Sequence, residues 1–271
     1  MKIQYASDLH LEFDSNAKLV NSEGFMPPVG DVLLLAGDII YLEDPNMESD
    51  PFFDWCADNF EQTVIVPGNH EYYMGMIRRD GHRDGVPLDN TLDGYERKIR
   101  PNVRYLNNKS IILGDTEVFA TTLWTVPGPN SYVSIQTCMN DCSQILYNHH
   151  RLWAYEYTEV HNICRGWLDR ALRESTAKHK VVLTHHCPTA RKDFDTHKFG
   201  SGIYSAFHVD MEPFISEHDI DCWIYGHTHL QMGSGAVLPS KGKGTTLLCN
   251  QLGYVSCDEH RDFNPECFVE L

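Results

Sequence analysis

Short apolar runs recur along the chain, and each stops abruptly at polar residues. Five of these runs are aliphatic or β-branched and have the length of buried strands: Lys2 to Ala6, Val32 to Ala36, Thr63 to Val66, Val181 to Thr184 and Cys222 to Tyr225. Between them lie segments with helical spacing: Phe52 to Phe60, Leu92 to Ile99, Tyr155 to Leu172 and Met211 to Ile215. This alternation predicts an α/β fold built in layers.

Four further runs have the pattern of antiparallel strands: Ser110 to Leu113, Glu117 to Ala120, Thr245 to Cys249 and Cys267 to Glu270. Together with the buried strands they predict two sheets. No repeat, low-complexity tract or linker divides the 271 residues, so we expect one domain over residues 1–271. The segment from Gly75 to Asn90 has the composition of a loop and contains Arg78, Arg79 and Arg83. It is either a solvated surface loop or a basic lid over an anionic substrate.

Composition narrows the functional classes. The 38 acidic residues outnumber the 22 basic ones, which argues against binding that follows a long nucleic-acid backbone. Nine cysteines without a CxxC pair favour free, mostly buried thiols. No segment has the length and apolarity of a membrane span, and the N-terminus lacks the pattern of a secretory signal, so we expect a cytoplasmic protein that binds no membrane. The composition leaves the oligomeric state open.

Residues suited to bind metal follow almost every predicted buried strand. Because the carboxyl ends of parallel strands meet at one edge of a sheet, we expect these residues to converge. One such cluster is weak evidence, but five in one chain are hard to explain by structural need alone. The clusters are Asp8 with His10, Gly37-Asp38, Gly68-Asn69-His70-Glu71, Thr184-His185-His186 and Gly226-His227-Thr228-His229.

In this order, the clusters resemble the motif blocks of the calcineurin-like metallophosphoesterase superfamily. The similarity to a bacterial and phage branch of predicted phosphoesterases spans nearly the whole chain. That branch shares the runs Ser7 to Phe13, Thr121 to Thr125, Met139 to Asp141, Thr184 to His186 and Trp223 to His229. The resemblance implies a four-layer αββα sandwich with two mixed β-sheets and a metal site at one edge.

The resemblance also implies two metal sites that share Asp38. The first ion would be held by Asp8, His10, Asp38 and His229, and the second by Asp38, Asn69, His185 and His227. Four imidazoles, two carboxylates and an amide oxygen suit transition metals better than Ca or Mg. We therefore expect two divalent ions, with Mn²⁺ first and Fe, Zn or Ni as alternatives.

The implied reaction is hydrolysis of a phosphate ester by a hydroxide that bridges the two ions. His70 resembles the general acid of the family, and Asp38 is catalytic through the metals. Related phosphatases place an Asp three residues after the Asp of Gly-Asp to orient this histidine, but here Tyr41 stands at that position. Glu71, Glu43 or Asp44 could replace the missing partner. Expected substrate contacts are Asn69, His70, His186, Asn140 and Asp141.

The predicted function is hydrolysis of a small phosphodiester or phosphomonoester, with nucleotides among the candidates. One alternative is a nuclease that acts on short or single-stranded nucleic acid, since no basic stripe supports binding of an extended duplex. Another is a metal-binding scaffold without activity. The retention of seven expected metal ligands and of His70 argues against a scaffold.

Overall fold

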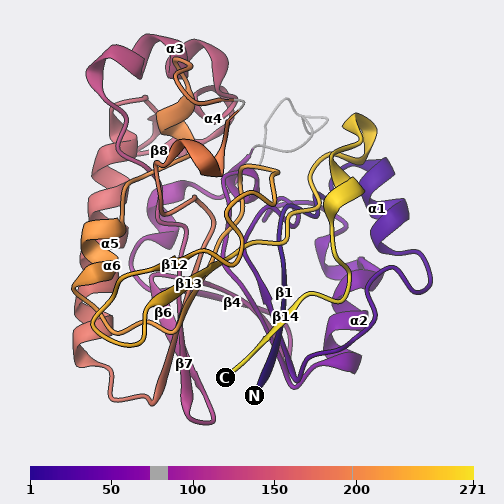
Figure 1. Cartoon of the computed structure of the whole chain (residues 1–271). Helices are drawn as coiled ribbons and strands as arrows, with labels where there is room; N and C mark the ends of the chain where they lie inside the picture. Colours follow the sequence, from indigo (N-terminus) through magenta and orange to yellow (C-terminus); the bar gives the residue numbers. More distant parts are fainter. Residues whose placement is uncertain (74–84, 197) are drawn as a thin grey trace.

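Two six-stranded β-sheets face each other at the centre of the computed structural model, which describes residues 1–73, 85–196 and 198–271 (Figure 1). Helices cover the outer face of each sheet, so the layers run helix, sheet, sheet, helix. This arrangement confirms the predicted α/β fold with two mixed sheets.

The first sheet contains four central parallel strands with an antiparallel strand at each edge, in the order β14-β1-β2-β3-β5-β4. In that order, its strands are Phe268–Glu270, Lys2–Ala6, Val32–Leu35, Gln62–Ile65, Val103–Asn107 and Tyr95–Arg100.

The second sheet repeats this plan in the order β12-β13-β11-β10-β7-β6. Its strands are Val237–Leu238, Thr245–Leu248, Cys222–Ile224, His179–Thr184, Thr116–Thr121 and Lys109–Leu113. A separate hairpin pairs β8 (Leu146–Tyr147) with β9 (His150–Arg151).

The helices divide between the two outer faces and the end of the sandwich that carries the site (Figure 1). Helices α1 (Asp14–Val20) and α2 (Pro51–Asn59) lie over the first sheet. Helices α5 (Glu156–Glu174) and α6 (Glu212–Ser216) lie over the second. The short helices α3 (Tyr132–Cys138) and α4 (Asp141–Gln144) lie beyond the strand ends.

Alternation of side chains along the strands builds the layers. Tyr5 and Leu34 point between the sheets, whereas Leu33 and Leu35 point to the helices over the first sheet. The buried strands therefore carry apolar residues on both faces, as expected for parallel strands covered on both sides.

Six of the nine cysteines are buried and all nine are free thiols, as predicted.

The helix predicted from Leu92 to Ile99 is wrong. Residues Tyr95–Arg100 form edge strand β4, which pairs antiparallel with β5. Tyr95 and Ile99 are half-buried against the core while Glu96 is exposed, so a period of two fits the segment as well as the helical period did. Among the described residues, no helix is long and apolar enough to cross a membrane.

Candidate metal centre

The predicted metal ligands meet at one end of the sandwich, where parallel strands of both sheets finish. Each lies in the loop that follows its strand: Asp8 and His10 after β1, Asp38 after β2, Asn69 after β3, His185 after β10, and His227 and His229 after β11. All are buried except His229, whose side chain is 13% exposed.

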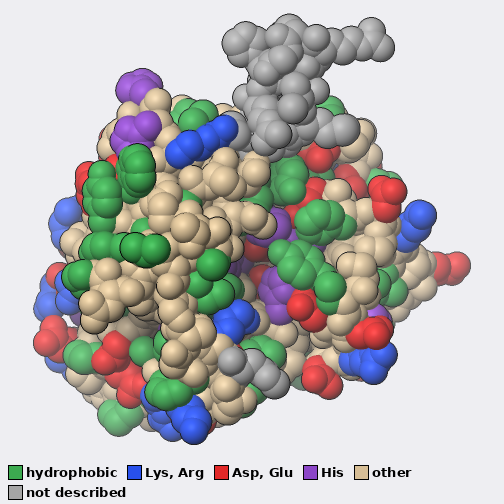
Figure 2. Space-filling view, turned by 90° about the horizontal axis from the view of Figure 1, so that it is seen from above, with side chains coloured by type: hydrophobic (Ala, Val, Ile, Leu, Met, Phe, Trp, Pro, Cys, Tyr) green, Lys and Arg blue, Asp and Glu red, His purple; other side chains and the backbone are tan. Residues whose placement is uncertain are grey.

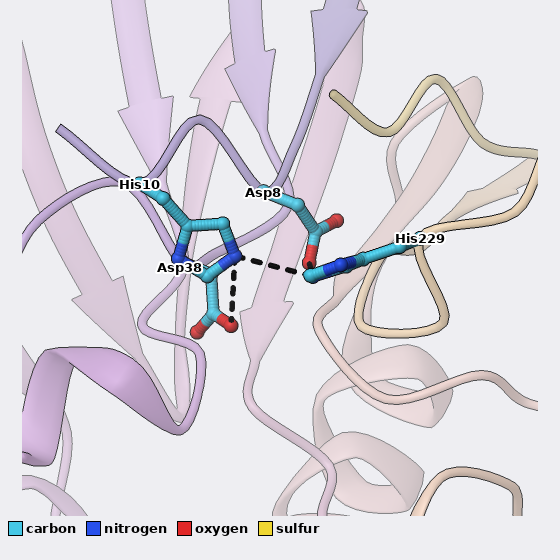
Figure 3. Close-up of side chains that lie close together, drawn as sticks. All are labelled: Asp8, His10, Asp38 and His229. Atoms are coloured by element: carbon cyan, nitrogen blue, oxygen red, sulfur yellow. Dashed lines mark hydrogen bonds and ion pairs between the residues drawn. The ribbon is translucent and has the colours of Figure 1, made fainter. Parts of the chain in front are cut away.

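Their side chains form two clusters that share Asp38. The first donor group is Asp8, His10, Asp38 and His229, shown in Figure 3, and the second donor group contains Asp38, His185 and His227. Within each, one potential ligand atom per residue lies within 4.8 Å of the others. Asn69 joins the second donor group, because its Oδ1 lies 2.9 Å from His185 Nε2.

Asp38 stands between the groups and turns one carboxylate oxygen to each. Its Oδ2 lies 3.8 Å from His10 Nε2, and its Oδ1 lies 3.4 Å from His185 Nε2. The backbone N–H of His70 also donates to Oδ1, at 2.9 Å, which fixes the rotation of the carboxylate.

Hydrogen bonds on the outer ring nitrogens orient the Nε2 atoms of His10 and His229 into the first donor group. His10 Nδ1 lies 3.0 Å from a Glu12 oxygen, and His229 Nδ1 lies 2.6 Å from a Glu259 oxygen. A neutral imidazole that donates through Nδ1 carries its lone pair on Nε2, and these two Nε2 atoms are 3.1 Å apart. Donors that share one ion at about 2.1 Å lie about 3 to 3.5 Å apart, so this group fits a metal ion.

The second donor group converges in the same way. His185 Nδ1 donates to the carbonyl oxygen of Ala36 at 2.8 Å, which leaves the lone pair on Nε2. That atom faces His227 Nδ1 at 3.1 Å and the amide oxygen of Asn69 at 2.9 Å. The Asn69 amide nitrogen donates away from the centre, to Asp141 at 2.8 Å. Electron-rich atoms thus converge here as well, and this donor set also fits a cation.

Electrostatics differ between the two donor groups. Burial alone would raise the pKa of Asp8, but the hydrogen bond with His229 lowers it to about 2. Burial would lower the pKa of His229, but hydrogen bonds with Asp8 and Glu259 raise it to about 9. In the second donor group, burial lowers the pKa of His185 to about 4. At pH 7 a proton therefore occupies the first donor group, and His185 is neutral.

The loops that present these donors are held in strained backbone. Five of the seven predicted ligands have left-handed φ angles between 51° and 74°: Asp8, His10, Asp38, His227 and His229. Such angles in non-glycine residues cost about 1–3 kcal/mol each and concentrate at functional sites. A Cβ on Gly226 would lie 2.7 Å from Asp8 Oδ2, and one on Gly68 would clash with Asp38, so only glycine permits this close approach.

His70 lies beside the donor groups, and its carboxylate partner is Glu12. One oxygen of Glu12 accepts from His70 Nδ1 at 2.8 Å and from His10 Nδ1 at 3.0 Å. The other ring nitrogen of His70, Nε2, lies 3.2 Å from the hydroxyl of Tyr254. It borders an open cavity that is lined by predicted metal ligands and is called the hollow below. Glu12 thus links the predicted general acid to a predicted metal ligand.

The three carboxylates considered from the sequence have other partners. Glu71 accepts backbone N–H groups of Asp38, Ile39 and Gly68, at 2.8 to 2.9 Å, and so ties two site loops together. Glu43 lies 3.9 Å from Arg97, and Asp44 accepts from the backbone of Asn46. The missing Asp after Gly37-Asp38 is thus replaced from the first loop, two residues beyond His10.

The three tentative substrate contacts separate in the structure. Asn140 is exposed and lines the hollow, as expected for a substrate contact. Asp141 is fully buried, and its oxygens are taken by Asn69, Tyr73 and Tyr157, so it supports a predicted metal ligand instead.

His186 is also fully buried. Its Nδ1 lies 3.1 Å from the carbonyl oxygen of Thr122, and its ring packs against His227. Because it does not line the hollow, the geometry gives no support to a substrate contact. Its neighbour in sequence, His185, also packs against His227, and the rings of His185 and His186 meet edge to face with centroids 5.4 Å apart.

Figure 2 looks into the hollow, with histidine side chains at its floor and hydrophobic side chains around them. Besides the predicted ligands, the lining includes Lys198 and Tyr254, which no sequence motif indicated. Most of the loop predicted from Gly75 to Asn90 lies outside the described residues, since residues 74–84 are among those left out.

Comparisons with known proteins agree with this geometry. Residues 1–231 match the calcineurin-like phosphoesterase family. Protein L509 of Acanthamoeba polyphaga mimivirus is 26% identical over 285 aligned residues, which cover 99% of this chain and 96% of the viral protein. Among solved structures, the phosphopantetheinyl hydrolase PptH of Mycobacterium tuberculosis superposes with a TM-score of 0.68 at 14% identity. The superposition covers 100% of this chain and 95% of that one, which supports the fold.

Proposed function

The chain belongs to the calcineurin-like phosphoesterases, hydrolases that act on phosphoester bonds, and from this premise we propose that it hydrolyses a small phosphodiester or phosphomonoester with two divalent metal ions. The observation that carries the proposal is the position of Asp38, which turns one oxygen to each of two donor groups whose lone pairs converge. In this proposal Asp8, His10 and His229 hold one ion, and Asn69, His185 and His227 hold the other.

When bound, the two ions would supply water activated at neutral pH and positive charge against the phosphoryl oxygens. The chain contributes orientation. Asp141 and the Tyr73 hydroxyl hold the amide nitrogen of Asn69, at 2.8 Å and 3.0 Å, so that its oxygen faces the centre. The nitrogen-rich donor set favours Mn²⁺, Fe, Zn or Ni, and Mn²⁺ is our first choice.

His70 is proposed to donate a proton to the leaving oxygen. Its Nδ1 hydrogen bonds Glu12, so the exchangeable position at Nε2 faces the hollow. Burial would raise the pKa of Glu12, but its contacts with His10 and His70 lower it to about 2. A carboxylate that stays ionised keeps accepting from Nδ1, and so it holds the ring of His70 in one orientation.

The proposal can be tested with purified protein and bis(p-nitrophenyl) phosphate. We expect hydrolysis in the presence of Mn²⁺, loss of activity with a chelator, and recovery when Mn²⁺ is added back. Turnover that persists in excess chelator would contradict a metal mechanism. Because the protein of similar fold is named a phosphopantetheinyl hydrolase, phosphopantetheine esters belong in the substrate panel with nucleotides and sugar phosphates.

The same protein can be assayed on short single-stranded oligonucleotides, and efficient cleavage there would favour the nuclease alternative.

We also propose that residues 1–271 act as one domain, because β14 pairs with β1 and so joins both ends of the chain in one sheet. A single cooperative unfolding transition by two spectroscopic probes would support this, and two separate transitions would contradict it.

A further inference from the structure

Two hollows meet at His70. The first has a volume of about 280 Å³ and is lined by predicted metal ligands from both donor groups, including Asp38 and His227. The second has a volume of about 520 Å³ and contains none of the predicted ligands. Four residues line both hollows and form the boundary between them: His70, Tyr73, Asn140 and Tyr254.

This arrangement fixes where each half of a substrate must lie if the proposed function holds. The reacting phosphoryl group lies in the first hollow, next to the donor groups. A proton from His70 Nε2 must reach the leaving oxygen over hydrogen-bonding distance, so that oxygen lies beside His70. The remainder of the leaving group then extends into the second hollow.

The second hollow is aromatic and, apart from His70, has no charged side chain in its described lining. Its described lining has four aromatic rings, from Phe13, Tyr41, Tyr73 and Tyr254, and no Lys, Arg, Asp or Glu. The rings of Phe13 and Tyr254 meet edge to face with centroids 5.6 Å apart. Aromatic walls stack against planar rings, and apart from His70, which gives its proton to the leaving oxygen, nothing in the described lining compensates an anion.

Besides the donor groups, the first hollow is lined by Lys198 and by Glu259, whose carboxylate accepts from His229 and from the backbone N–H of Tyr254. Lys198 Nζ lies 3.3 Å from the carbonyl oxygen of Thr228, the residue between His227 and His229. Its other neighbours are Asp195 at 3.6 Å and the ring of Phe207, whose centroid is 4.5 Å away. The ammonium group is thus anchored at the rim of the metal centre and is 29% exposed, so it can contact a further anion.

We propose that the enzyme selects phosphodiesters by charge on the two sides of the reacting phosphorus. An uncharged alcohol that carries a planar ring, such as a nucleoside, leaves through the second hollow. The fragment that keeps the reacting phosphate carries another anionic group, which Lys198 binds. Hydrolysis breaks the bond between phosphorus and the leaving oxygen while the oxygen of water bonds to phosphorus. A proton from His70 completes the alcohol, the attacking water loses a proton to solvent, and His70 takes a proton back from solvent.

Two deoxyadenosine dinucleotides test this inference directly, one with an extra phosphate at its 5′ end and the other with it at its 3′ end. If charge selects the leaving group, both give deoxyadenosine and deoxyadenosine 3′,5′-bisphosphate, although opposite ester bonds are cut. If strand polarity selects it, one of the two substrates gives two mononucleotides instead. Chromatography of the products separates these outcomes, and two mononucleotides from either substrate would overturn the inference.

The inference rests on the proposed function but can fail without it. Metal-dependent hydrolysis of bis(p-nitrophenyl) phosphate with no cleavage of either dinucleotide would overturn the charge selection and leave the phosphoesterase proposal intact. No hydrolysis of any of these esters under any metal would defeat both.

Two variants assign the selection to its residues. Tyr41→Leu should raise KM for both dinucleotides about 5- to 100-fold, the usual effect of losing one ring that stacks on a base. Lys198→Met should lower the preference for the phosphorylated dinucleotides over the same dinucleotide without a terminal phosphate, deoxyadenylyl-(3′→5′)-deoxyadenosine, by about tenfold. Phe25→Leu removes an aromatic ring and Lys192→Met removes a lysine, both outside the two hollows, and these variants serve as controls. Equal effects in variants and controls would contradict the assignment.

Discussion

The first and second donor groups offer similar atoms to the candidate centre but are supported by different chemistry. Carboxylates of Glu12 and Glu259 accept from the imidazoles of the first group, at 3.0 Å and 2.6 Å. In the second group the imidazole of His185 donates to a backbone carbonyl, and no described carboxylate accepts from the ring of His227.

This difference predicts unequal metal sites. An imidazole that donates to a carboxylate is a more basic ligand, and such supporting partners commonly change metal affinity 10- to 100-fold. We therefore expect the first donor group to hold its ion more tightly. The second, with a neutral amide among its ligands, would hold a more exchangeable and more electron-poor ion.

The largest effect is expected from Asp38→Asn, because Asp38 is the one residue common to both groups. We expect hydrolysis of bis(p-nitrophenyl) phosphate to fall at least about a thousandfold, as both ions lose a shared charged ligand. Asp54→Asn, at an exposed residue on α2, is the matched control. Activity within tenfold of the native protein at saturating Mn²⁺ would show that the two groups do not work as one centre.

A second test concerns Glu12, which supports His10 and His70 together. Glu12→Gln should lower turnover about 10- to 100-fold for esters with poor alkyl leaving groups, because His70 loses the carboxylate that orients its ring toward the leaving oxygen. Esters of p-nitrophenol, which needs little protonation, should lose much less. An equal loss on both ester classes would assign Glu12 to metal binding alone. The variant Glu61→Gln makes the same change of charge at another glutamate and serves as the control.

Removing the other carboxylate should affect one ion only. Glu259→Gln is expected to weaken the first ion about tenfold, the lower end of the usual range because Glu259 is 34% exposed. The second ion should keep its affinity. Metal titration with the exposed Glu266→Gln variant as control measures both constants, and equal weakening of the two ions would remove the proposed distinction.

The smallest effect is a difference in proton release. Contacts with Asp8 and Glu259 raise the pKa of His229 to about 9 against burial, so the metal-free imidazole is protonated at pH 7 and must lose its proton to bind a metal. Affinity of the first ion should therefore rise with pH from 7 up to about 9 and then level off. Burial lowers the pKa of His185 to about 4, so that ring has no proton to release.

Calorimetric titrations in buffers of different ionisation enthalpy measure this release. About one proton is expected for the first ion at pH 7 and none from His185 for the second. Release of the same number of protons by both ions would contradict the electrostatic difference between the groups.

Local motifs made much of the site predictable. Each predicted ligand directly follows a buried strand, and parallel strands bring their carboxyl ends to one edge whatever the details of the loops. The position of the donors could therefore be inferred from short runs such as Asp8 to His10. The helix predicted at Leu92 to Ile99 failed for a related reason, since a short amphipathic run fits two periods and its pairing with β5 decides between them.

The supporting residues were harder to predict because chain neighbours need not be spatial partners. Glu71 directly follows His70, yet its carboxylate binds backbone N–H groups, and His70 is met by Glu12 from 58 residues earlier. Glu12 lies within a motif run and could have been considered. Glu259 lies 30 residues beyond His229, in a segment without a motif, and only the fold brings the two together.

The most direct test of the two-ion centre is anomalous diffraction from crystals grown with Mn²⁺. We expect two peaks separated by the carboxylate of Asp38, one bonded to Asp8, His10 and His229 and the other to Asn69, His185 and His227. A single peak, or peaks bonded to other residues, would contradict it.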